Sequence, residues 1–112
     1  MEPLRAERLS SPLDGPLGLF AWKGVTSAQA LEPHLGVGLK TMQVDGEFAG
    51  ASLRLLGCLS PALDVWHLVK DADGADMILT QPGLVTIRTQ CYAYLPVVVG
   101  GTDTHLDIYL LG

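Results

Sequence analysis

Short segments in which apolar and polar residues alternate follow one another from residue 19 to the end of the chain. In THLDIYLL, residues 104–111, every second side chain from Leu106 to Leu110 is apolar. A period of two is typical of a β-strand that turns one face to a core. Segments of this kind, rich in Val, Ile, Leu, Thr and aromatic residues, are 19–23, 40–44, 51–56, 65–69, 77–80, 84–90, 93–99 and 104–111.

Turn-forming residues separate these segments. Gly, Pro and Asp recur about every eight to twelve residues, which is the spacing of an all-β sandwich or barrel, and no stretch carries a convincing helical period. The sequence therefore predicts an all-β fold: an antiparallel two-sheet sandwich, jelly-roll-like, with about eight strands. Pro96, inside AYLPVVV, is expected at a sheet edge or a bulge, because proline has no N–H to donate.

The first 18 residues, MEPLRAERLSSPLDGPLG, have a different pattern. Their prolines and the lack of a sustained period predict an extended N-terminal arm, residues 1–18, ahead of a β-sandwich domain, residues 19–112. Two interpretations of the arm remain open: a disordered terminus, or a segment that packs on a neighbouring subunit. The leucines of the arm favour the second, because a freely solvated tail usually carries fewer apolar side chains.

Composition narrows the classes of function. A chain of 112 residues builds one domain with one modest core. Charged residues make up 17% of it, against roughly 25% in an average soluble domain, which points to a contact surface. The net charge is −5 and no run of Lys or Arg occurs, so nucleic acid is not an expected partner. No apolar run approaches the roughly 20 residues of a membrane span and no signal-like segment opens the chain, so we expect no membrane partner and synthesis in the cytoplasm.

The densest cluster of carboxylates is KDADGAD, residues 70–76. Counted from Asp71, the glycine falls too early, and Pro82 stands where a calcium loop needs its bidentate glutamate. Asp-Gly between two apolar segments instead predicts a tight turn.

The other candidate groups also lack a catalytic or metal-binding arrangement. The three histidines do not have the spacing that fixes two of them on one metal ion, and Ser52 lacks the GxSxG context of a nucleophile. Cys58 and Cys91 are too far apart for a CxxC motif, so we expect two reduced thiols, with a disulfide or a metal role as the alternatives. The sequence predicts no catalytic residue, no cofactor and no metal ion, and it gives little support to an enzyme.

A series of short motifs follows the predicted strands. They are Trp22-Lys23-Gly24-Val25-Thr26, Met42 to Ala51, Leu56-Gly57-Cys58, Trp66 to Gly74, Ile87-Arg88 and Gly100 to Leu110. In this order and spacing, the chain from about Leu19 to Leu111 resembles the capsid decoration, or cement, proteins of tailed bacteriophages, which are small virion proteins with a jelly-roll-like sandwich. The loops at 57–63 and 92–96 depart from the family's pattern, so contacts made by those loops are not carried over.

The resemblance implies a non-enzymatic structural protein of the virion, made in the host cytoplasm, that binds the outer surface of the capsid shell and stabilises it. The implied partner is the major capsid protein, with self-association as a dimer or trimer on the capsid. Many weak contacts act together on such a closed lattice. The contact residues that we hypothesise lie in the arm and at its junction with the first long strand: Leu4, Leu9, Leu13, Leu17, Leu19 and Trp22.

Two alternatives remain open. A tail or fibre attachment component would use the same sandwich to join other proteins. A carbohydrate-binding module would stack exposed aromatic side chains on sugar rings, and the candidates for that role are Trp22, Trp66, Tyr92, Tyr94 and Tyr109.

Overall fold

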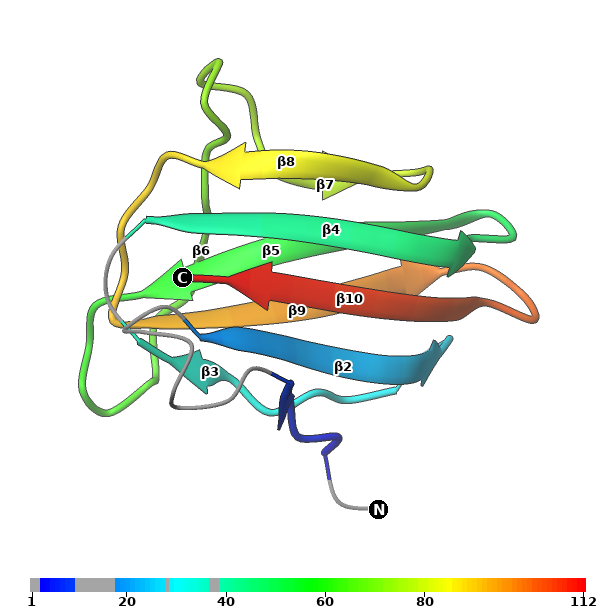
Figure 1. Cartoon of the computed structure of the whole chain (residues 1–112), viewed down its shortest axis with the longest axis horizontal. Helices are drawn as coiled ribbons and strands as arrows, with labels where there is room; N and C mark the ends of the chain where they lie inside the picture. The colour runs from blue at the N-terminus through cyan, green and yellow to red at the C-terminus, as the bar shows by residue number, and fades with distance from the viewer. Residues whose placement is uncertain (1–2, 10–17, 28, 37–38) are drawn as a thin grey trace.

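The computed structural model describes residues 3–9, 18–27, 29–36 and 39–112, and within them the chain is all β (Figure 1). The strands are β1 (Glu7–Arg8), β2 (Leu19–Thr26), β3 (His34–Leu35), β4 (Lys40–Glu47), β5 (Ala51–Cys58), β6 (His67–Leu68), β7 (Ile78–Leu79), β8 (Gly83–Ile87), β9 (Ala93–Gly100) and β10 (His105–Leu111). They form two antiparallel sheets, which confirms the predicted sandwich. Over these residues the structure contains no helix long and apolar enough to cross a membrane.

The two sheets pack face to face. The front sheet has the strand order β1-β2-β10-β4-β8, and the back sheet has the order β3-β9-β5, with β6 and β7 both paired to β5. In Figure 1 the strands β2, β10, β4 and β8 lie in front of β5 and β9. The sheets join strands that are far apart in the chain: β2 pairs with β10 from Leu19 opposite Leu111 to Thr26 opposite His105.

The core lies between the sheets. Along β10, Leu106, Ile108 and Leu110 are at most 1% exposed, so the alternation in the sequence places them inside. Leu53 and Leu55 of β5 contribute to the same core from the back sheet. Removing this apolar surface from water is the main favourable term in folding. Other core residues are Trp22, Val25, Met42, Val44, Met77, Ile87, Tyr94 and Val98.

Each of the eight predicted segments contains a strand, and two short strands, β1 and β3, are additional. The strand predicted over 84–90 ends at Ile87. It ends there because the chain meets residues 70–72: the N–H of Arg88 donates to the carbonyl of Lys70 at 2.8 Å.

Pro96 lies on the open side of a strand, as predicted. It is in β9, opposite Leu55 of β5. On its other side β9 pairs with β3 at Ala93 and Tyr94 alone, among the described residues. The position of Pro96 is therefore a local sheet edge, where a missing N–H costs no ladder hydrogen bond.

The described part of the N-terminal arm belongs to the sandwich. Glu7 and Arg8 pair with Ala21 and Phe20 at the edge of the front sheet. Further towards the N-terminus, the N–H of Leu4 donates to the carbonyl of Ala30 at 3.0 Å. Residues 3–9 thus pack on their own chain.

The KDADGAD segment is a turn, as predicted. The N–H of Gly74 donates to the carbonyl of Asp71, and the carboxylate of Asp71 accepts hydrogen bonds from the N–H groups of Asp73 and Ala75, both at 2.9 Å. Gly74 has a φ of +84°, a conformation that favours glycine. Lys70 and Asp76 form an ion pair across the turn. Nowhere in the described ranges are three or more His, Cys, Asp or Glu side chains grouped so that they could hold a metal ion.

Candidate interaction surface

The described contact residues of the prediction fall into two groups, because Leu4 and Trp22 pack into the core while Leu9 and Leu19 lie side by side, the N–H of Leu9 donating to the carbonyl of Leu19 at 2.7 Å. Leu4 is partly buried and packs against the core, while Leu9 is 40% exposed beside the edge strand. Leu19 is half-buried on β2, next to Leu111 of β10. Leu13 and Leu17 lie outside the described residues.

Trp22 has no surface to offer a partner, which corrects its predicted place among the contact residues. Its side chain is 0% exposed. The indole N–H donates to the carbonyl of Glu32 at 3.1 Å, and the ring meets His34 edge-on at 6.5 Å between centroids. Trp22 therefore holds the segment before β3 to the core instead of contacting another molecule.

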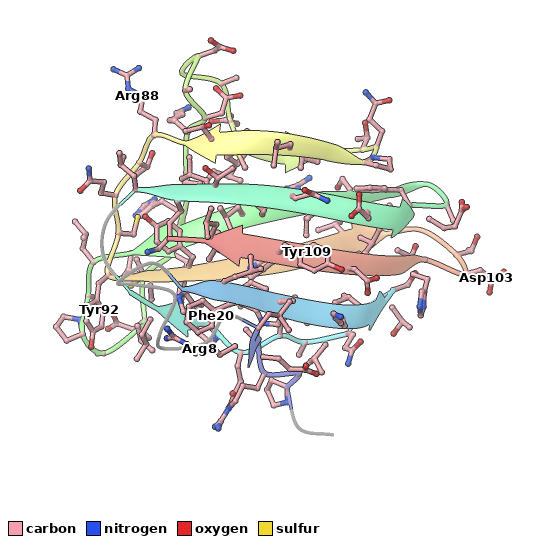
Figure 2. All side chains as sticks on the ribbon, viewed as in Figure 1. Arg8, Phe20, Arg88, Tyr92, Asp103 and Tyr109 are labelled. Atoms are coloured by element: carbon pink, nitrogen blue, oxygen red, sulfur yellow. The ribbon has the colours of Figure 1, made fainter. Side chains whose placement is uncertain are left out.

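The aromatic side chains do not form one sugar-stacking platform either. Tyr94 is buried as completely as Trp22, and its hydroxyl donates to the carbonyl of Thr89 at 3.0 Å. Figure 2 shows Tyr92 at one end of the sandwich and Tyr109 on the front of β10, far from it. Two of the five candidate residues for sugar stacking, Trp22 and Tyr94, are therefore buried. Tyr92 and Tyr109 do not share a surface on which one sugar could stack.

A cavity of about 370 Å³ lies beside the arm. Arg5 and Glu32 form an ion pair at 2.8 Å on its rim. Arg8 lies over the ring of Phe20, 5.5 Å from its centre, and the two residues can be followed at one end of β2 in Figure 2. The ion pair and the ring contact hold the described part of the arm to its own sheet. The lining residues are Arg5, Ala6, Phe20, Glu32, Pro33, His34, Leu35 and Leu63.

His34 in this cavity is kept neutral by its surroundings. Burial, and next the nearby charge of Lys40, lower the pKa of His34 below its ordinary value of 6.5. Lys40 is itself 2% exposed, and burial lowers its pKa from the ordinary 10.5. The carboxylate of Glu32, which lines the same cavity, is paired with Arg5. His34 thus packs against the ring of Phe20, 4.1 Å between centroids, as an uncharged aromatic group.

We expect the free energy of unfolding to fall as the pH is lowered from about 7 to about 5. The unfolded state, with a histidine pKa of 6.5, binds the proton before the folded state does, so the stability is lost as the pH falls through the folded pKa of His34. Urea unfolding at several pH values would measure this loss. The variant His34→Gln should show a weaker dependence than wild type, whereas His105→Gln, at an exposed position of β10, should keep it. An unchanged dependence in His34→Gln would contradict the prediction.

A second cavity, of about 300 Å³, lies where the loops after β5 and before β9 meet, and it contains both cysteines. Cys58 and Cys91 are free thiols, as expected, and both are buried. Burial, and next the proximity of Cys58, raise the pKa of Cys91 above its ordinary value of 9.0. A raised pKa leaves less of the thiol as thiolate, which is the nucleophilic form.

Comparison with protein-family models, with curated proteins and with solved structures finds no match. A proposal for the function of this chain is therefore argued from its own surface chemistry.

The outer side of the back sheet carries mainly apolar side chains. Leu53 and Leu55 of β5 point into the core with 0% exposure, so the residues between and beside them point outward. Residues that are paired across neighbouring strands point to the same side of a sheet. The pairing of β5 with β9, β6 and β7 therefore identifies the outward residues of those strands. We call this surface the back face, and it consists of Ser52, Arg54, Leu56, Leu68, Ile78, Leu95, Val97 and Val99.

The outer side of the front sheet is more polar. Strands β4 and β10 turn Thr41, Gln43 and Asp45, and His105 and Asp107, outward, since their alternate residues are in the core. Apolar side chains lie on this side too, in a cavity of about 140 Å³ that is lined by Leu19, Thr41, Gln43, Leu84, Tyr109 and Leu111. Gln43 donates to Asp45 at 2.8 Å. This contrast between the two sheets was missed from the sequence. The signal was present in AYLPVVV, because a run of apolar residues without alternation indicates a strand with both faces covered.

Proposed function

We propose that this chain is a non-enzymatic structural protein of a tailed-bacteriophage virion, which binds the outer surface of the capsid shell and stabilises it. The observation that carries the proposal is the back face, which sets the exposed Ile78 and Val99 among half-buried apolar side chains, because apolar surface left exposed on a small domain marks a site of protein contact. The motif order from Leu19 to Leu111, which resembles the phage decoration proteins, supports the shell as the protein contacted.

The physical mechanism of stabilisation is binding linkage. A protein that binds the assembled shell and not its separated subunits shifts the equilibrium towards the shell by mass action. A sandwich with two hydrogen-bonded sheets suits this role, since a rigid body that spans a junction resists the movement of the subunits beneath it. In this proposal the partner is the major capsid protein, and the chain is made in the host cytoplasm and ends on the capsid surface as a dimer or trimer.

The arm has a smaller part in the proposed contact than the sequence predicts. Leu4 packs on the core and Trp22 is buried, so Leu9 and Leu19 are the described residues of that set with surface for a partner. Deleting residues 1–16 would also remove β1 and the contacts of Leu4, so substitution of Leu9 is the cleaner test of the arm.

Co-sedimentation with capsid shells tests the proposal. Purified protein is mixed with emptied, undecorated shells of the phage that encodes it, and bound protein is measured against its free concentration. We expect saturable binding and a rise in the temperature at which the shells are disrupted. Isolated tails from the same phage serve as the comparison. Binding to tails alone would replace the proposal with the attachment role, and binding to neither would overturn it.

A further inference from the structure

The back face combines two exposed apolar side chains with half-buried apolar side chains on the same side of one sheet. Ile78 and Val99 are 41% and 42% exposed. Leu56 of β5 lies between Leu95 of β9 and Leu68 of β6 in the register of the sheet. A solvated sheet face normally places polar residues at such outward positions. This surface is therefore built for contact with another molecule.

One positive charge lies in the middle of the back face. Arg54 pairs with Val97 on one side and with Ile78 on the other, so its neighbours across the sheet are apolar. Its side chain is exposed, and it forms no ion pair with any of the residues described; the ion pairs found there join Arg5 to Glu32 and Lys70 to Asp76. A guanidinium on an apolar surface is suited to a carboxylate, which it binds through two parallel hydrogen bonds.

A twofold contact with a second copy of this chain does not supply that carboxylate. The back face carries no Asp or Glu. A twofold contact through it would bring Arg54 towards Arg54 of the other copy, because the same surface meets itself in such an interface. Like charges that meet in a contact disfavour it. The charge pattern therefore favours a partner that presents an acidic group over a twofold dimer through the back face.

The size of the back face also favours a repeated partner. Strands β5 and β9 have eight residues each. At about 3.3 Å per residue and about 4.8 Å between strands, three strands cover roughly 400 Å² in projection. A standard stable complex buries about 800 Å² of accessible surface on each partner. A contact on a surface of this extent gains affinity when a lattice binds many copies together.

We infer that the back face is the surface that docks on the partner, and that Arg54 binds an Asp or Glu side chain within an apolar patch of that partner. The inference rests on the proposed function, which supplies the capsid shell as the repeated partner. It adds which side of the sandwich faces the shell and what chemistry the shell presents there.

Two pairs of matched variants test the inference in the co-sedimentation assay. Arg54→Glu is compared with Arg88→Glu, which makes the same charge change at the exposed position beyond β8 that is labelled in Figure 2. Val99→Lys on the back face is compared with Leu84→Lys, which places a charge on β8 of the front sheet. Leu9→Asp tests the arm in parallel. Thermal unfolding of each variant shows whether it is folded, and folded variants alone are compared.

We expect Arg54→Glu to weaken binding to shells about tenfold or more, because it sets a carboxylate against a carboxylate. Arg54→Lys should lose less, since it keeps the charge but not the two parallel hydrogen bonds. Val99→Lys should also weaken binding, while Arg88→Glu and Leu84→Lys should bind like wild type. Wild-type binding should weaken as salt is raised.

The outcomes separate the inference from the proposed function. Wild-type protein that binds neither shells nor tails would overturn the function. Wild-type protein that binds shells, with Arg54→Glu and Val99→Lys unimpaired, would overturn the inference and leave the function in place. Sedimentation velocity of the free protein tests the other occupant: if Val99→Lys dissociates a dimer that wild type forms in solution, the back face holds a second copy, and the inference is wrong.

Discussion

Replacing Trp22 with alanine is expected to lower the free energy of unfolding by about 3–5 kcal/mol. The side chain is completely buried, and in the register of the front sheet it lies beside Ile108. Removing the indole leaves a large cavity. It also leaves the carbonyl of Glu32, which accepts the indole N–H at 3.1 Å, without that partner.

The loss at Trp22 extends to the N-terminal segment. The N–H of Glu32 donates to the carbonyl of Leu4 at 2.7 Å, so the segment that Trp22 holds in place also holds the start of the described chain. Since small domains are stable by about 5–15 kcal/mol, this single change removes a large part of the total.

Urea denaturation followed by circular dichroism would measure the effect. Trp66→Ala is the matched control, because Trp66 is half-buried in a loop and its indole donates to the carbonyl of Leu63 at 3.0 Å. We expect the control to lose clearly less stability than Trp22→Ala. Equal losses in the two variants would show that Trp22 is not the anchor described here.

Replacing Gly46 with alanine is expected to cost about 3 kcal/mol, although the change adds one methyl group. Gly46 has a φ of +116°, where a side chain is strained. A Cβ at this position would lie 2.2 Å from the carbonyl oxygen of His105, on the paired strand β10. Because the obstacle is backbone in a central strand, it cannot move aside without disturbing the pairing of β4 with β10.

Gly83→Ala is the matched control for this prediction. Gly83 lies in β8, paired with the same strand β4, and a Cβ added there meets no atom within 4 Å. We expect the control to change the free energy of unfolding by less than about 0.5 kcal/mol. If thermal and urea unfolding give both variants the same stability, the close approach of His105 is not what requires glycine at position 46.

Gly46 also shows where a local pattern misleads. Asp45-Gly46-Glu47 has the composition of a turn, and the strand was predicted to end at residue 44. In the structure β4 continues to Glu47, and the chain reverses at Ala49 and Gly50, which both have positive φ. This is the backbone of a two-residue hairpin turn. The glycine at 46 is explained by a strand that comes close, and that strand lies some 60 residues further along the chain.

The back face also depends on strands that are distant in the sequence, so it could not be predicted from a local pattern. Sequence alternation identified Leu53 and Leu55 as one face of β5, and both are in the core. It did not show that Leu56 would meet Leu68 and Leu95 on the opposite side, because those contacts depend on which strands pair and in what register. The predicted contact residues clustered in the arm because they were neighbours in sequence, whereas the fold packs Leu4 against the core and buries Trp22.

The sequence by itself determined the class of fold, the location of the long strands and the turn at Asp71 to Gly74. These features are local, since a period of two and a Gly or Asp with special backbone freedom act within a few residues. Only the tertiary structure decided that Trp22 is buried, that Glu7 and Arg8 pair at the edge of the front sheet, that the two cysteines share a cavity, and that Arg54 has apolar neighbours across the back sheet. Each of these depends on segments that are distant in the chain, and their pairing is fixed by the burial of the whole core and not by any one segment's pattern.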